Sequence, residues 1–281
     1  MNDGWTNLCL LLGGSIFFPL SYFTTKYFLI KYFRHKFSLG DIYLICEKCT
    51  CSTQAVMSCL VGLIVVSQVT DIMKDTHWLI NAYAWFALPY FVHDVWAMYM
   101  TFVYNGSYKS EGLPPKDQAL KMFVCTSPLL IAHHVIMPCI IFPCIILLRK
   151  DAGDFFVATF YMIELTIPFI SARAVLAQLN MQKTVYYIIV GLLMLTSFFA
   201  VRVLVFPYLY WRYAVHAGIS ILDVPTRIPI KCNLVCLMIL LPQLYWFWLM
   251  LRGAVKVFYR IGVRHKPEPN GIAMNGFGKS K

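Results

Sequence analysis

The chain has 281 residues, of which 59% are hydrophobic or aromatic and only 13% are charged. A soluble domain carries about 25% charged residues, so this sequence has too few polar side chains to cover a surface that faces water. The composition excludes a soluble globular domain, a disordered chain and a small disulfide-linked secreted scaffold. The apolar stretches run continuously rather than alternating, which argues against a transmembrane β-barrel. We therefore predict a polytopic membrane protein.

The net charge of +11 raises the question of nucleic-acid binding. The cations lie mainly at the ends of apolar stretches, where they orient the chain and contact anionic headgroups. We therefore expect membrane lipids as partners and no nucleic acid.

Seven stretches are long enough to cross a bilayer, because a span needs about 20 mainly apolar residues. We expect an all-α membrane protein with about seven transmembrane helices, at residues 8–30, 50–69, 79–104, 122–148, 154–179, 185–211 and 232–251. The first stretch is too long for a signal peptide and lacks a small-residue cleavage site. Residues 263–281 are rich in turn formers and polar residues, which predicts a disordered tail.

The distribution of Lys and Arg predicts the orientation of the chain. Most cations fall on one side if the N-terminus is lumenal and the C-terminus cytosolic, as the positive-inside rule favours. The glycosylation sequon at Asn105 then lies in the cytosol, so we expect it to be unmodified.

Three of the ten cysteines, Cys46, Cys49 and Cys51, form the sequence CEKCTC before the second stretch. A structural zinc site needs four ligands, and the chain offers no second CxxC or HxxxH pair. We therefore predict no metal site here. Two readings stay open, juxtamembrane thiols that accept palmitate and plain free thiols.

Ionisable residues inside the predicted spans mark candidate functional sites, because a charge at mid-bilayer is costly. His93 and Asp94 lie roughly 15 Å from the cytosolic end of the third span, and His133 and His134 roughly 17 Å into the fourth. The two pairs are thus expected in one layer. A carboxylate beside an imidazole suits a general base or a nucleophilic histidine. The same contact also satisfies a buried histidine structurally, and binding of a metal or a proton is a third alternative.

Two further charges lie at matching depth. Glu164 and Arg202 have opposite signs, so we predict an ion pair and favour a structural clamp over a catalytic role. Arg173 lies near the cytosolic face, where it can snorkel or contact an anionic headgroup or phosphate. With Tyr90, these three residues are the candidate substrate-binding residues.

Six motifs in chain order resemble the TLC-domain (TRAM–Lag–CLN) family, which includes the ceramide synthases, and are most similar to its TLC domain-containing protein 3 subgroup. The motifs are PYFVHDVWAMY at 89–99, AHHVIM at 132–137, GDFF at 153–156, ELTIPFIS at 164–171, RVLVFPYLYW at 202–211 and PQLYWF at 242–247. The resemblance implies an N-terminal transmembrane helix and basic cytosolic connection at 1–37, a TLC domain at 38–262 and a cytosolic tail at 263–281.

The resemblance further implies that six helices form a barrel around a lipid-accessible cavity. It implies residence in the endoplasmic reticulum membrane, with the Golgi or plasma membrane as alternatives. In ceramide synthases a paired-histidine motif carries acyl transfer from acyl-CoA to a sphingoid base, and this pair maps onto His133 and His134. We therefore expect a protein of lipid metabolism or homeostasis whose catalytic candidates are His133, His134, Asp94 and His93. Acyl-CoA is the expected co-substrate and a sphingoid base the acceptor, with no bound cofactor.

The sequence also departs from the synthase pattern. The motif HHxxT has Met137 in place of the threonine, and Asp151, Asp154 and Glu164 are not accompanied by a histidine in the downstream acidic region. Enzyme activity is thus left open, and the alternative is a non-enzymatic lipid-binding or regulatory protein. A solute transporter is less favoured, since no inverted repeat is visible. A homodimer is compatible with the sequence.

Overall fold

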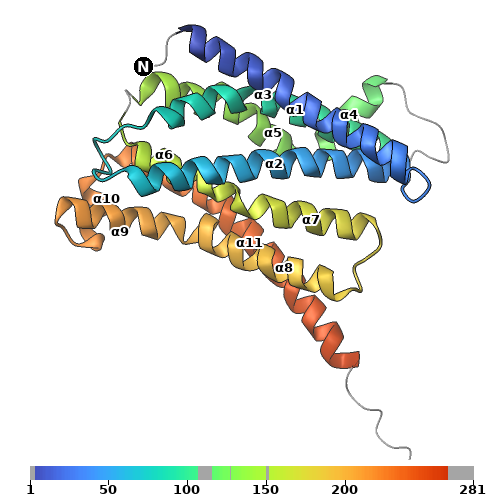
Figure 1. Cartoon of the computed structure of the whole chain (residues 1–281). Coiled ribbons are helices and arrows are strands. Elements are labelled where there is room, and N and C mark those ends of the chain that lie inside the picture. Colours follow the sequence, from blue (N-terminus) through green and yellow to red (C-terminus); the bar gives the residue numbers. More distant parts are fainter. Residues whose placement is uncertain (1–3, 107–115, 127, 150–151, 265–281) are drawn as a thin grey trace, which may run out of the picture.

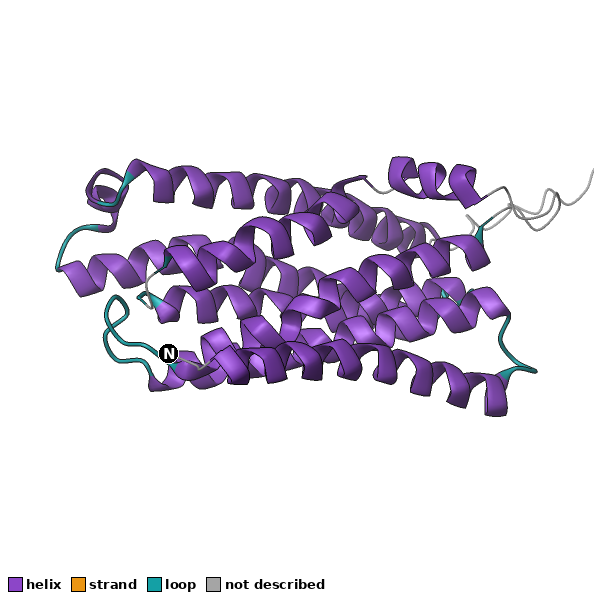
Figure 2. Cartoon of the chain, turned by 90° about the horizontal axis from the view of Figure 1, so that it is seen from above, coloured by secondary structure: helices purple, strands orange, loops and turns teal. Residues whose placement is uncertain are grey.

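A computed structural model describes residues 4–106, 116–126, 128–149 and 152–264. Every regular element within these ranges is helical, and Figure 2 shows helices joined by short loops at both ends of the bundle. The predicted all-α class is confirmed. The predicted tail at 263–281 lies almost entirely outside the described residues.

The helices follow one another along the chain and are labelled as in Figure 1. They are α1 (Gly4–Phe33), α2 (Leu39–Gln68), α3 (Trp78–Asn105), α4 (Lys116–Thr126), α5 (Pro128–Ile136), η2 (Met137–Ile141), η3 (Cys144–Leu148), α6 (Asp154–Tyr161), η4 (Met162–Thr166), α7 (Ile167–Gln178), α8 (Val185–Phe198), η5 (Phe199–Val203), α9 (Val205–Ala217), η6 (Ile221–Asp223), α10 (Val224–Arg227) and α11 (Ile230–Arg264).

Six helical stretches among the described residues are long and apolar enough to cross a membrane. They cover residues 4–33, 39–68, 128–147, 154–178, 185–217 and 230–257. Helix α3 is 28 residues long but is not one of these six stretches. Its Trp, Tyr, His and Asp side chains lower its mean hydropathy. It packs against α1 and α2. Of the seven expected spans, the one at 79–104 is not among the six that the described residues support by length and composition. The chain is therefore a multi-pass membrane protein.

The second helix begins well before the expected boundary at residue 50. Ser38 caps α2 by accepting from the Asp41 backbone N–H, while the Asp41 carboxylate accepts from the Ser38 N–H. The CEKCTC sequence therefore lies within the first half of α2 rather than before it. Glu47 and Lys48 made this segment resemble a flank, whereas their side chains lie within the bundle.

The fourth expected span, 122–148, corresponds to an apolar helix at 128–147 whose turns change from α to π. Pro128 begins α5, Pro138 lies in η2, and Pro143 directly precedes η3. Each proline removes a backbone N–H from the helical ladder, and the wider π turns of η2 and η3 follow these breaks. The paired histidines therefore lie on α5, a short segment bounded by prolines.

Two polar contacts align α2, α3 and α7 at one end of the bundle, which we call the Asp41 end. The Gln178 side-chain amide donates to Asp41 Oδ1 at 2.7 Å and to Asn105 Oδ1 at 3.1 Å. Gly40 permits the close approach, because a Cβ there would lie 2.2 Å from Asn105 Oδ1. Residues at equal rise from this end therefore lie in the same layer of the bundle.

The opposite end, which we call the Asp154 end, is fastened by a buried carboxylate. Asp154 pairs with Arg149 and accepts a hydrogen bond from the His77 backbone N–H at 2.5 Å. Arg149 also donates to Asn81 at 2.8 Å. Asp154 thus fastens the end of the fourth span and the start of α3 to α6. The polar residues described next lie between the two ends.

Candidate functional site

The centre of the site is a buried pair between α3 and α5. His134 Nε2 lies 2.7 Å from Asp94 Oδ2, with side chains 9% and 4% exposed. His134 Nδ1 lies 2.9 Å from the Leu130 carbonyl oxygen, which can only accept, so Nδ1 carries a hydrogen. Nε2 and the carboxylate oxygen can then bond only through one further proton between them. The predicted pairing of Asp94 with a histidine of the next span is confirmed for His134.

His133 differs from its neighbour in exposure and in bonding. Its side chain is exposed, and its ring lies 5.4 Å from that of His134, centroid to centroid. No hydrogen bond of its ring appears among the described residues. The ring nevertheless lies within electrostatic reach of Asp94 and Arg202. His133 is therefore the accessible imidazole of the cluster, while His134 is held by its partners.

Glu164 and Arg202 meet as predicted, although loosely. Arg202 Nη2 lies 4.0 Å from Glu164 Oε2, and Nη1 donates to Gln243 Oε1 at 3.5 Å. Arg202 Nε is buried without a hydrogen-bond partner in the described part of the chain. Glu164 lies in the 3₁₀ segment η4 and Arg202 in the π segment η5. Such departures from α-helix are frequent at functional sites.

Helix α2 contributes two residues that the sequence did not place in the site. Cys51 lies close to the Tyr90 hydroxyl, and the ammonium group of Lys48 lies within electrostatic reach of Asp94 and Cys51. Lys48 Nζ also donates to Glu47 Oε1 at 2.5 Å. We use "polar cluster" for Lys48, Cys51, Tyr90, Asp94, His133, His134, Glu164 and Arg202.

A signal for this part of the site was present in the sequence. Polar residues recur every three or four positions along α2, and all of these are buried. They are Glu47, Thr50, Gln54 and Ser58. This spacing places them on one face of a helix, which indicates that the helix already runs through residue 47 with a polar side toward the bundle.

His93 lies outside the polar cluster. Its ring packs 5.5 Å from Tyr22 of α1 and 5.6 Å from Trp96, so it occupies the side of α3 that faces α1. Both ring nitrogens are buried without a partner among the described residues. Consecutive residues point about 100° apart on a helix, so Asp94 and His93 cannot both face α5. The predicted catalytic role of His93 gains no support from these contacts.

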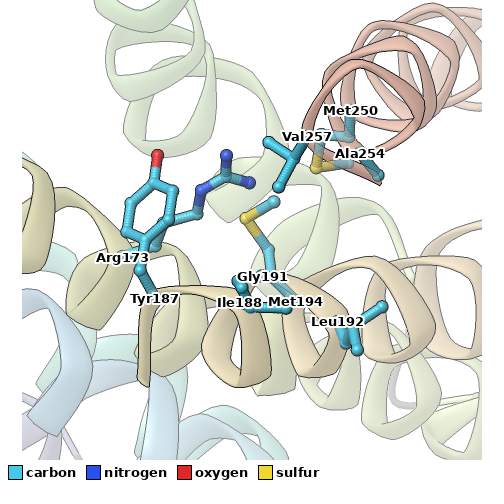
Figure 3. Close-up of a pocket in the computed structure, with 9 residues that line it drawn as sticks. All are labelled: Arg173, Tyr187, Ile188, Gly191, Leu192, Met194, Met250, Ala254 and Val257. Atoms are coloured by element: carbon cyan, nitrogen blue, oxygen red, sulfur yellow. The ribbon is translucent and has the colours of Figure 1, made fainter. Parts of the chain in front are cut away.

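Arg173 lies apart from the cluster, in α7. Its guanidinium stacks 4.7 Å above the Tyr187 ring. Figure 3 shows both residues beside a cavity of about 30 Å³ between α7, α8 and α11. That volume suits a small polar group at most, so Arg173 does not share one pocket with His133.

A larger hollow of about 530 Å³ lies between α9, α10 and α11. Its lining is largely apolar and includes Phe206, Tyr210, Ile230, Asn233, Cys236 and Leu240. The Tyr210 hydroxyl donates to Asn233 Oδ1 at 2.6 Å within it. Size and apolarity suit a lipid chain rather than a charged solute.

The helices define a multi-pass membrane protein with a cluster of ionisable side chains between its helices. Residues 44–252 match the family profile of the TLC domain, TRAM_LAG1_CLN8, and the chain belongs to this family. A TLC domain indicates a membrane protein of lipid metabolism. Every residue of the polar cluster falls within the matched range. No solved structure matches the chain.

Proposed function

We propose that this protein is an N-acyltransferase of the ceramide-synthase type that moves an acyl chain from acyl-CoA to a sphingoid base. The observation that carries the proposal is His133, an accessible imidazole inside the membrane beside the buried Asp94–His134 pair. The resemblance of six motifs to the TLC domain-containing protein 3 subgroup supports a position near that subgroup.

The proposed chemistry gives the two histidines different tasks. The amine nitrogen attacks the thioester carbonyl carbon, so that a C–N bond forms while the C–S bond breaks. The proton lost by the amine passes to His133 and then to the sulfur of the departing CoA thiol. His134 does not act as the base, because its contacts with Leu130 and Asp94 leave it no free ring nitrogen. A second route has His133 attack first and carry the acyl group as an acyl-imidazole.

We propose that the protein resides in the endoplasmic reticulum membrane with its N-terminus lumenal and its C-terminus cytosolic. The support is the excess of Lys and Arg on that side of the spans. The Asp41 end is then cytosolic, which suits acyl-CoA arriving from the cytosol. Terminal epitope tags in selectively permeabilised cells test this orientation, because only the C-terminal tag is expected to be accessible before the internal membranes are opened.

One observation favours a second candidate, a lipid-binding or regulatory protein without turnover. The 2.7 Å contact between Asp94 and His134 also suits a purely structural pair, and Met137 replaces the threonine of the synthase motif. In that case the polar cluster holds a lipid headgroup, and lipid composition depends on binding alone.

The two candidates are separated by acyl transfer in membranes that lack background activity. Membranes with the wild type, His133→Ala or His216→Ala receive labelled palmitoyl-CoA and sphinganine, and products are identified by lipid mass spectrometry. His216 is the matched control, because it lies 3.8 Å from Asp71 in a different part of the fold. We expect His133→Ala to lower amide formation at least about 100-fold and His216→Ala to leave it unchanged. Turnover retained in His133→Ala refutes the proposed role of His133, and a wild type without any labelled amide favours the second candidate.

A further inference from the structure

Two cations of the polar cluster have no part in the proton transfers described above. Lys48 lies on α2 and Arg202 on η5. An ammonium or guanidinium group inside a bilayer requires hydrogen-bond acceptors for its N–H groups. We therefore compare the number of N–H donors of each cation with the number of hydrogen-bond acceptors that the protein offers it.

Only some of the N–H donors of Lys48 have an acceptor among the described residues. Its side chain is 24% exposed, and one hydrogen bond, to Glu47 Oε1 at 2.5 Å, is made among the described residues. An ammonium group has three N–H donors. Two donors on a partly exposed lysine are therefore free to bind a ligand.

The N–H donors of Arg202 have weaker hydrogen bonds than those of Lys48, although Arg202 is more deeply buried. Its side chain is 11% exposed, and its two polar contacts, with Gln243 and Glu164, are as long as 3.5 and 4.0 Å. Nε is buried without a partner in the part of the chain that the structure describes. A guanidinium has five N–H donors, and a buried donor without an acceptor costs about 1–3 kcal/mol. This arrangement is typical of a residue that binds an acceptor from outside the protein.

Lys48 and Arg202 both lie near the same residue, Cys51. Cys51 lies within electrostatic reach of both Lys48 and Arg202 and close to the Tyr90 hydroxyl. Asp94 Oδ2 is engaged by His134 and Glu164 faces Arg202, while Asp94 Oδ1 is buried without a partner among the described residues. Lys48 and Arg202 nevertheless keep several N–H donors without an acceptor in the described part of the chain. His133, which interacts with Arg202, is exposed and marks an accessible side of this region.

We propose that Lys48 and Arg202 form a binding site, beside Cys51, for the carbonyl or carboxylate oxygens at the end of a lipid's hydrocarbon chain. The inference rests on the proposed function for one point, that an acyl carbonyl bound there faces His133. Two sources share this chemistry, a free fatty carboxylate and the thioester of an acyl-CoA. Binding itself needs no turnover, so it is measurable separately.

The test uses the purified full-length protein in lipid nanodiscs and two photoactivatable probes. One probe is a palmitic acid with a diazirine and a terminal alkyne, and the other is the CoA thioester of the same chain. We expect Lys48→Met to lower labelling by at least one probe about tenfold or more, and Lys48→Arg to keep it within about threefold of the wild type. Lys26→Met is the matched control, because Lys26 is a partly buried lysine of α1 whose Nζ donates to the Tyr43 hydroxyl at 2.7 Å.

Labelling by the carboxylate alone identifies a free fatty acid as ligand, and labelling by the thioester alone identifies the acyl donor. Unchanged labelling in Lys48→Met overturns the inference, as does a wild type that neither probe labels. Thermal unfolding of each variant is measured alongside, and Arg202→Gln provides the same test if Lys48→Met does not fold. If the wild type forms the amide but Lys48→Met is labelled as strongly as the wild type, this inference is refuted and the proposed enzyme activity is not. Lys48-dependent labelling without any amide formation refutes the proposed enzyme activity alone.

Discussion

Asp94 and His134 hold one proton between two acceptors inside the membrane. The 2.7 Å contact joins Nε2 to Oδ2, while Nδ1 of the same ring is committed to the Leu130 carbonyl. The pair is therefore neutral overall, either as imidazolium and carboxylate or as imidazole and carboxylic acid. Removing one member leaves the other with a buried, unmatched group, whereas His133 has no comparable partner.

This relationship predicts a graded response to substitution of Asp94. We expect Asp94→Ala to lower the free energy of unfolding by about 3–5 kcal/mol, because a buried ion pair loses one member. Asp94→Asn is expected to cost less, about 1–2 kcal/mol, because its amide N–H can donate to Nε2 of a neutral ring. Unfolding of the purified protein in detergent, followed by intrinsic fluorescence, measures both. His133→Ala serves as control and is expected to leave stability nearly unchanged. Equal stability of Asp94→Ala and the wild type contradicts the shared proton.

The contact between α1 and α3 depends on one glycine of an adjacent pair. A Cβ at Gly14 would lie 1.9 Å from the backbone oxygen of Phe86, so no side-chain rotation relieves the clash. A Cβ at Gly13 would meet the Phe86 ring at an ordinary 3.9 Å. We expect Gly14→Ala to destabilise the protein by about 1–3 kcal/mol, as overpacking does, and Gly13→Ala to have little effect. Thermal unfolding of the two variants compares them directly, and equal midpoints are incompatible with this packing.

The loop between α2 and α3, at residues 69–77, lies outside the spans and is held by two carboxylates. The backbone N–H groups of Met73 and Lys74 hold the pKa of Asp71 below its ordinary value. The pKa of Asp75 is lowered by the backbone N–H of Asp71 and by hydrogen bonds from Thr70. A lowered pKa in the folded state contributes stability above the unfolded pKa, near 4, and this contribution is lost as the pH falls through the folded pKa.

We therefore expect the loop at 69–77 to open at pH below about 4 while it is closed at pH 6. Hydrogen–deuterium exchange of peptides covering the loop, corrected for the intrinsic rate at each pH, measures the opening. Asp75→Ala removes the acceptor of the Thr70 and Asp71 backbone N–H groups and is expected to raise exchange already at pH 6. A loop equally protected at both pH values, or unaffected by Asp75→Ala, disproves this role of the carboxylates.

The sequence by itself determined the all-α membrane class and the depth of the charged residues. Both follow from composition and from the fixed rise of a helix, which are properties of the chain taken in one dimension. For that reason Asp94 and His134 were expected in one layer, and Glu164 opposite Arg202, and the structure places them so.

Only the tertiary structure decided which side of each helix faces the site. Asp94 contacts α5 and His93 faces α1, although the two are adjacent in sequence. Lys48 and Cys51 join the polar cluster because α2 extends back to Leu39, beyond the charges that made the segment resemble a cytosolic flank. Mean hydropathy averages over all residues of a segment and does not depend on which side of the helix each side chain occupies. A charged side chain is tolerated in a span when packing orients it toward a partner. That orientation is set by neighbouring helices, and these come together only in the fold.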